Sequence, residues 1–235
     1  LTLSTSAVHA TNPALYAKLS FDTIKDFTHI TLLTSAPNML VVNPKIPARN
    51  ITELIAYAKA NPGKLTYISN GSGTSPHMAA ELLKSVAGIN ITHVPYKNIS
   101  QGFTDLVGGQ VQILVANANV PLGQLKSGAV KALAITSAKR MPSAPDIPTV
   151  AESGMKDFEF VSWYGVWGPK GLPPEIVQKL QTEMAKAVKD PGVQERMGVQ
   201  GFESVGSTAY EFAKYVGTEM AKYGKIIKAA NIKID

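Results

Sequence analysis

The sequence predicts an α/β fold, because segments with strand character alternate with segments of helical periodicity along the whole chain. Residues 111–116 are apolar almost without interruption, which is typical of a strand buried on both faces of a parallel sheet. Residues 176–188 carry apolar side chains on one side only, which is typical of a helix packed on such a sheet. With 235 residues, the chain is long enough for one large or two small domains.

The remaining elements follow from the same patterns and from the Gly and Pro residues that separate them. Further strands are expected at residues 1–4, 30–33, 39–42, 65–69, 89–94, 130–136, 158–167 and 203–205. Further helices are expected at residues 12–16, 50–61, 75–87, 100–107 and 120–126, after Pro191, and from a cap at Ser207 to about Ala230.

Two long β-rich stretches, residues 30–42 and 158–167, lie between blocks of alternating strands and helices. We interpret them as crossover strands that join two lobes with mostly parallel sheets. The expected first lobe comprises residues 1–42 and 165–235, and the second comprises residues 43–164. A ligand is then expected between the lobes, where the strands of α/β folds end.

A glycine-rich turn separates the strand at residues 65–69 from the helix that follows it. Gly71 and Gly73 allow a tight turn, Ser75 is a good N-cap, and Pro76 suits the first helical position. Such a turn places backbone N–H groups and the positive end of the helix dipole where an anion can bind. The spacing matches neither a dinucleotide-binding fingerprint nor a P-loop, so a plain connection remains the alternative.

Composition excludes several classes of function. The net charge is +6, but Lys and Arg are spread along the chain, so we do not expect nucleic acid binding. The chain has no Cys, which excludes disulfides and thiol catalysis. His9 and His93 stand alone at spacings that suit no metal site, so neither a metal nor another cofactor is expected. No membrane-spanning run and no signal peptide are expected within these residues.

Other polar and aromatic residues are weaker candidates for ligand contact. Ser6 and Asn117 each follow a predicted strand, at the edge where ligands bind, but a loop hydrogen bond or an Asx turn explains them equally well. Tyr96 and Trp163 either line the cleft or pack in the core. His77 falls in the first turn of its helix, where it either contacts a ligand or orients the glycine turn.

Eight short stretches together resemble one family, the extracytoplasmic solute receptors of tripartite tricarboxylate transporters, also called the Bug family. The stretches are residues 11–16 (TNPALY), 41–44 (VVNP), 70–77 (NGSGTSPH), 93–97 (HVPYK), 108–111 (GGQV), 134–140 (AITSAKR), 146–152 (DIPTVAE) and 162–165 (SWYG). The resemblance covers nearly the whole chain. It implies a type II periplasmic-binding-protein fold and delivery of a small carboxylate from the periplasm to a membrane permease.

The resemblance also implies roles for individual residues. Gly73, Thr74 and Ser75 match a clamp that holds a carboxylate through backbone N–H and hydroxyl groups. A second clamp lies, in the family, in an N-terminal portion that has no counterpart here. We therefore expect residues 1–4 to form an exposed sheet edge, at which this chain self-associates, and carboxylate binding to be weak.

Three hypotheses about function remain open from the sequence. The first is a non-catalytic receptor that closes its two lobes around a small carboxylate. The second is an α/β enzyme that acts on a carboxylate with His77 or His93 as its base. The third is a sensing or interaction protein that descends from such a receptor and has lost tight binding.

Overall fold

The computed structural model describes residues 1–232, and contacts within the chain divide it into two compact units. The first unit combines Leu1–Ala36 with Ser162–Asp235, and the second unit is Pro37–Val161. Two strands, β2 (Phe27–Val42) and β7 (Val161–Pro169), contain residues of both units. β2 contains the predicted crossover segment 30–42, and β7 overlaps the predicted segment 158–167 from residue 161 onward. The predicted lobe boundaries, after residues 42 and 164, stay a prediction.

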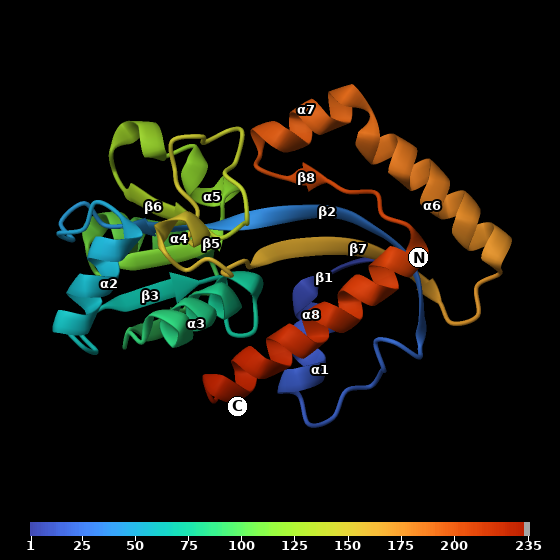
Figure 1. The fold of residues 1–235 in the computed structure, drawn as a ribbon, viewed down its shortest axis with the longest axis horizontal. Coiled ribbons are helices and arrows are strands. Elements are labelled where there is room, and N and C mark those ends of the chain that lie inside the picture. Colours follow the sequence, from blue (N-terminus) through green and yellow to red (C-terminus); the bar gives the residue numbers. More distant parts are fainter. Residues whose placement is uncertain (233–235) are drawn as a thin grey trace. The chain divides into compact units, whose positions relative to one another are not determined.

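The first unit is built on a sheet in which β7 lies between β1 (Thr2–Thr5) and β2. β1 pairs antiparallel with β7, and β2 pairs antiparallel with the short strand β8 (Glu203–Ser204). The long helix α8 (Ala209–Ala229) packs against a π-helical turn at Ala7–Thr11 and against α1 (Asn12–Leu15), as Figure 1 shows. Two further helices complete the unit, α6 (Pro174–Lys189) and α7 (Pro191–Val199).

Aromatic side chains form the core of the first unit. Trp163 and Trp167 are fully buried and contact the ring of Phe212 at centroid distances of 6.1 and 4.8 Å. His9 stacks on Trp167 at 3.8 Å and is itself buried. Gly165 lies directly under Phe212, because a Cβ atom at this position would meet the ring at 2.0 Å. The absence of a side chain at residue 165 therefore lets α8 approach β7 closely.

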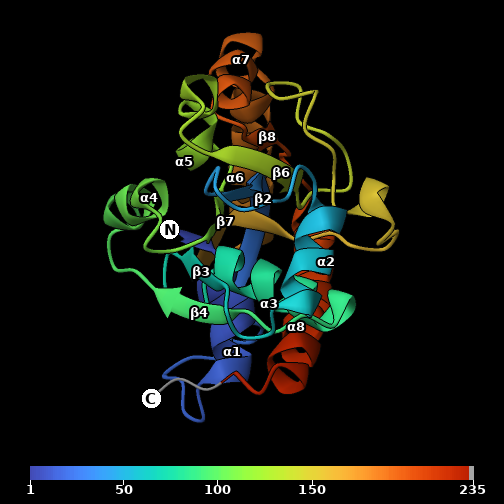
Figure 2. The ribbon, with the colours of Figure 1, turned by 90° about the vertical axis from the view of Figure 1, so that its left-hand side faces the viewer.

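The second unit is built on a sheet with both parallel and antiparallel pairs. β3 (Thr66–Ser69) lies between β4 (Thr92–Pro95) and β5 (Ile113–Asn117) and is parallel to both, as Figure 2 shows for β3 and β4. β2 pairs antiparallel with β5 and with β6 (Lys131–Ile135). The helices are α2 (Ile51–Ala60), α3 (Ser75–Ala87), α4 (Ile99–Gly108) and α5 (Asn119–Leu122).

The core of the second unit contains the central apolar side chains of these strands. Met39, Ile68 and Leu114 are fully buried and belong to one cluster that also includes Leu106 of α4. The apolar run that predicted a doubly buried strand is β5, whose first four residues are buried. Burial of each such side chain stabilises the fold by about 1.5–3 kcal/mol.

β2 is one continuous strand, whereas the sequence indicated two β-rich runs interrupted at residues 35–38. The strand continues because its partners change at that point: Thr34 and Ser35 pair with β8, and Asn38 pairs with β5. Pro37 lacks an N–H group, but its carbonyl accepts from the N–H of Ala118 at 3.0 Å. A proline is therefore tolerated where the strand passes from one sheet to the other.

The architecture agrees with the α/β fold that the sequence predicts. Residues 1–4, expected as a strand, correspond to β1, which lies at one end of the strand order and pairs with β7. No helix within residues 1–232 combines the length and the hydrophobicity needed to cross a lipid bilayer.

Candidate functional site

The strongest candidate site is the turn between β3 and α3 in the second unit. Gly71 and Gly73 have φ values of +115° and +78°, a region that favours glycine. Thr74 closes the turn, since its hydroxyl donates to the carbonyl of Gly71 at 2.7 Å. The turn is therefore held in one conformation by its own hydrogen bonds and leads directly into the N-terminus of α3.

The N-cap of α3 is Thr74, not Ser75 as the sequence suggested. Thr74 is extended (φ −71°, ψ 160°), while Ser75 is already helical and Pro76 follows at the second helical position. The physical reason is that Pro is tolerated throughout the first turn, so its position fixes the start of a helix only to within one residue. The Thr74 side chain makes no capping hydrogen bond. The side chains of Asn50, Asp190 and Thr208, by contrast, cap α2, α7 and α8.

A buried polar network ties this turn to the centre of the second unit, and the sequence did not predict it. Asn38 is fully buried, and its amide nitrogen donates to the Ser75 hydroxyl at 3.1 Å and to the carbonyl of Phe160 at 3.4 Å. The Asn38 backbone N–H donates to the Thr136 hydroxyl at 2.9 Å, and this hydroxyl lies 2.5 Å from the Phe160 carbonyl. Ser75 is thereby held in place by Asn38 of β2, which is itself held by Thr136, the residue after β6.

His77 forms a hydrogen bond with the glycine turn and so orients it, which is one of the two roles that the sequence allowed. Its Nδ1 atom accepts a hydrogen bond from the backbone N–H of Gly73 at 3.1 Å, and the side chain is 4% exposed. The ring stacks on His93, with centroids 4.1 Å apart. Burial lowers the pKa of both rings to about 4, so both are neutral at neutral pH.

Two other predicted contacts lie elsewhere in the second unit. Tyr96 follows β4, packs against the core of the unit and donates its hydroxyl proton to Asp105 at 2.7 Å. Asn117 is the last residue of β5 and lies opposite Asn38 in the sheet. Asn117 thus shares an end of the sheet with the Asn38–Ser75 network.

The remaining two candidates belong to the first unit. Trp163 is fully buried, and its indole Nε1 donates to Glu219 at 3.3 Å. Ser6 is 2% exposed and precedes the π-helical turn. Both side chains take part in the packing of α8 against the sheet. For Trp163, core packing was one of the two roles that the sequence allowed.

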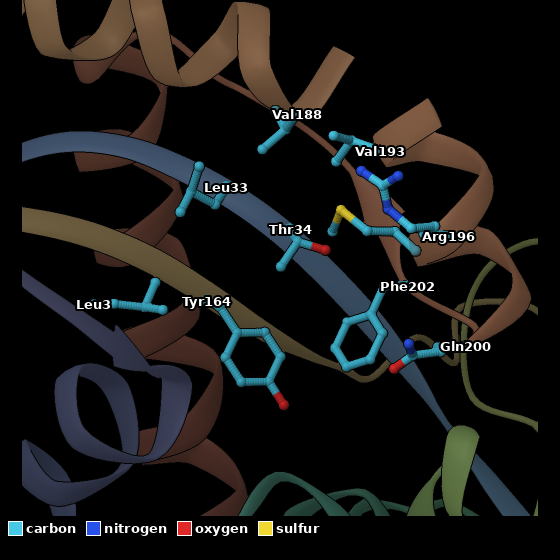
Figure 3. Close-up of a pocket in the computed structure, with 10 residues that line it drawn as sticks. Leu3, Leu33, Thr34, Tyr164, Val188, Val193, Arg196, Gln200 and Phe202 are labelled. Carbon is cyan, nitrogen blue, oxygen red and sulfur yellow. The ribbon is translucent and has the colours of Figure 1, made fainter. Parts of the chain in front are cut away.

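The first unit also contains an apolar pocket of about 500 Å³. Figure 3 shows Leu33 and Tyr164, from β2 and β7, on one side and Val188 and Val193, from α6 and α7, on the other. Leu3 of β1 completes the apolar wall, and Arg196 lies at the same pocket. None of the predicted site residues lines it. The pocket suits apolar groups better than a small dicarboxylate.

One histidine lies beside a serine hydroxyl, but the burial of that serine does not suit hydrolysis. His93 lies 2.8 Å from the Ser69 hydroxyl, which is a nucleophile–base distance, but Ser69 is completely buried. A substrate could not reach that oxygen without opening the sheet. Among residues 1–232, no group of three or more His, Asp or Glu side chains is arranged to hold a metal ion.

The family model of the tripartite tricarboxylate transporter family receptor matches residues 1–232. The chain belongs to this family. Among curated relatives, a UPF0065 protein from the tcbD–tcbE intergenic region of Pseudomonas sp. strain P51 is 35% identical over 213 residues, which are 90% of this chain. The match spans 63% of the length of that relative.

Solved structures of receptors from this family share the fold. One is Rpa4515 from R. palustris with adipate, which has a TM-score of 0.88 and 33% sequence identity. The match covers 98% of this chain and 77% of the Rpa4515 chain. The periplasmic binding protein BugD has a TM-score of 0.84 and 33% identity, covering 98% and 78%. MatC from Rhodopseudomonas palustris with bound malate has a TM-score of 0.82 and 27% identity, covering 96% and 78%. The family fold is therefore that of periplasmic solute-binding proteins.

Proposed function

We propose that this receptor-family chain binds a small carboxylate at the turn before α3 and serves a tripartite tricarboxylate transporter. The observation that carries the proposal is the start of α3, where the Thr74 side chain does not cap the helix and its hydroxyl donates to the Gly71 carbonyl in the turn. Donors in the first turn, together with the helix dipole, form a receptor for an anion that needs no Arg or Lys counter-ion. Adipate in one relative and malate in another support a dicarboxylate as the ligand class.

The clamp in this proposal consists of Gly73, Thr74 and Ser75, with Ser75 held by Asn38. The carboxylate accepts from the hydroxyl and backbone N–H of Ser75. It also replaces the Gly71 carbonyl and Nδ1 of His77 as the acceptors for the Thr74 hydroxyl and the Gly73 N–H. Asn117, on the neighbouring strand end, is the proposed contact for the rest of the ligand. Of the other candidates, Tyr96, Ser6 and Trp163 hold the surrounding structure in this proposal, since each already has a role in packing.

Ligand binding is proposed to close the two lobes through β2 and β7, which each run from one unit into the other. A ligand that binds the closed form better shifts the population toward it. The closed receptor then delivers the carboxylate to the membrane permease of the transporter. The periplasm is the proposed location, because related receptors such as BugD are periplasmic.

The double substitution Thr74→Ala with Ser75→Ala is expected to weaken adipate binding by about 1–3 kcal/mol, the loss that charge-assisted hydrogen bonds produce. Isothermal titration measures the change. Ser153→Ala is a suitable control, because that hydroxyl lies outside the turn and donates to the nearby carbonyl of Thr149 at 3.1 Å. Equal affinities of the double variant and the parent chain would remove this turn from the site.

The enzyme hypothesis predicts turnover, whereas the receptor hypothesis predicts binding alone. Mass spectrometry of adipate and malate after long incubation with the chain separates the two. We expect both acids to be recovered unchanged, and a converted product would overturn the receptor assignment.

The 235-residue chain is also expected to self-associate through β1. Leu1 and Leu3 are 69% and 64% exposed, and β1 lies at one end of the strand order. The strand carries no charged side chain, so a second copy of β1 can pair with it antiparallel. Light scattering should show a mass that rises with concentration.

Leu3→Lys should restore a monomer, because a charge on an edge strand opposes pairing. Tyr210→Lys is the matched control, since Tyr210 is 78% exposed and belongs to α8, not to β1. A parent chain that stays monomeric at every concentration contradicts the expectation.

A further inference from the structure

His77 and Gly73 interact in a way that depends on the protonation state of the imidazole. Nδ1 of His77 accepts the Gly73 N–H at 3.1 Å, so it must carry no proton in this state. A proton on Nδ1 would place two donors opposite each other and break the contact. The bond that orients the proposed clamp therefore exists only while His77 is neutral.

The groups that face His77 come from three elements. Tyr67 of β3 and His93 of β4 lie on one side, with ring centroids 6.4 and 4.1 Å from that of His77. On α3, Glu81 accepts from the Tyr67 hydroxyl at 2.6 Å and from Lys84 at 2.7 Å. The Lys84 ammonium thus neutralises the only carboxylate among these groups. With both histidines neutral the cluster carries no net charge, and one added proton makes it cationic.

A carboxylate bound beside this turn shifts the protonation equilibrium of His77 toward the imidazolium. It replaces Nδ1 as the acceptor for the Gly73 N–H, and its negative charge favours an imidazolium a few ångströms away. His93 stacks on His77, so the positive charge of one ring opposes a second protonation. With a carboxylate bound, the pair can therefore take up one proton, but not two.

We propose that His77 is a positioning residue that couples carboxylate capture to proton uptake. Neutral His77 keeps the Gly73 N–H in a hydrogen bond with its own Nδ1 atom. Protonated His77 releases this N–H to the ligand. This inference rests on the proposed function of the turn. Because linkage is reciprocal, the ligand raises the proton affinity of His77 as much as the proton raises the affinity for the ligand.

Isothermal titration of adipate into the full chain, in two buffers with different ionisation enthalpies, measures the protons taken up. We expect more uptake at pH 6 by the parent chain than by His77→Asn, whose side-chain oxygen can accept the Gly73 N–H but cannot titrate. Affinity of the parent chain should rise about two- to threefold from pH 7.5 to pH 6, and that of His77→Asn should stay nearly constant. Protons bound by adipate itself cancel in this comparison.

His93→Asn is the matched control, because it removes the stacked ring but leaves Nδ1 of His77 beside Gly73; it should keep the proton uptake. Equal uptake and equal pH dependence in the parent chain and His77→Asn, with adipate still bound, overturn the coupling and leave the carboxylate site intact. A parent chain that binds no adipate at any pH overturns the proposed function, and the coupling with it.

Discussion

The chain should lose much of its stability between pH 6.5 and pH 5. All four histidines have a lowered pKa: burial brings His9, His77 and His93 each to about 4 and lowers that of His29 as well. In the unfolded chain the pKa of each ring returns to about 6.5. Between these values the unfolded state binds more protons, so its free energy falls relative to the folded state as the pH falls.

The size of the stability loss follows from the difference between the folded and unfolded pKa of each histidine. A ring with a folded pKa of about 4 costs about 2 kcal/mol of stability at pH 5, relative to neutral pH. Both units are affected, since His9 and His29 lie in the first and His77 and His93 in the second. Coupling within each pair reduces the sum, but several kcal/mol is a large part of a typical stability of about 5–15 kcal/mol.

Thermal unfolding at a series of pH values tests this expectation. The Tm should be nearly constant from pH 8 to pH 7 and at least about 10 °C lower at pH 5. His9→Phe keeps an aromatic ring on Trp167 without a titrating group, and should flatten the profile of the first unit. A Tm that does not change down to pH 5 would mean that the rings are already protonated or solvated in the fold.

Gly165→Ala should destabilise the first unit by about 3 kcal/mol, because the added methyl group overpacks the core. The new Cβ would meet Cζ of Phe212 at 2.0 Å and two further ring atoms at 2.8 Å. Phe212 cannot move away easily, since it is fully buried against Trp163 and Trp167. Denaturant titration measures the loss.

Two further variants identify the cause. Gly217→Ala places a methyl group on α8 where no atom lies within 4 Å, and should stabilise the helix by up to about 1 kcal/mol. Phe212→Leu shortens the side chain that clashes, so the loss in the double variant with Gly165→Ala should be smaller than the sum of the two single losses. Additive losses would show that the methyl group and the ring do not meet.

Local signals predicted the elements and the turn well. Gly71 and Gly73 were expected to form the turn before α3, and both have the positive φ that only glycine adopts freely. The apolar run at residues 111–116 and the amphipathic stretch at residues 176–188 correspond to β5 and α6. These predictions succeed because hydrophobic periodicity and turn chemistry act over a few residues.

Long-range contacts could not be predicted in the same way. Asn38 bonds Ser75, which is 37 residues away, and Phe160, which is 122 residues away, so no local pattern marks it as a partner of the turn. Its one signal is a polar residue directly before the apolar run at residues 39–42. The cap at Thr74 differs by one position because Pro76 fits more than one place in the first turn. The continuity of β2 through Pro37 depends on Ala118, a partner on another element.

Amide NMR of the ¹⁵N-labelled chain, titrated with adipate, tests the central claim that the turn before α3 holds a carboxylate. The account predicts the largest shifts at the backbone N–H groups of Gly73, Thr74 and Ser75, with smaller shifts at Asn38, which bonds Ser75. Shifts confined to Leu3, Tyr164 and other residues of the apolar pocket in the first unit, or no shifts at millimolar adipate, would contradict it.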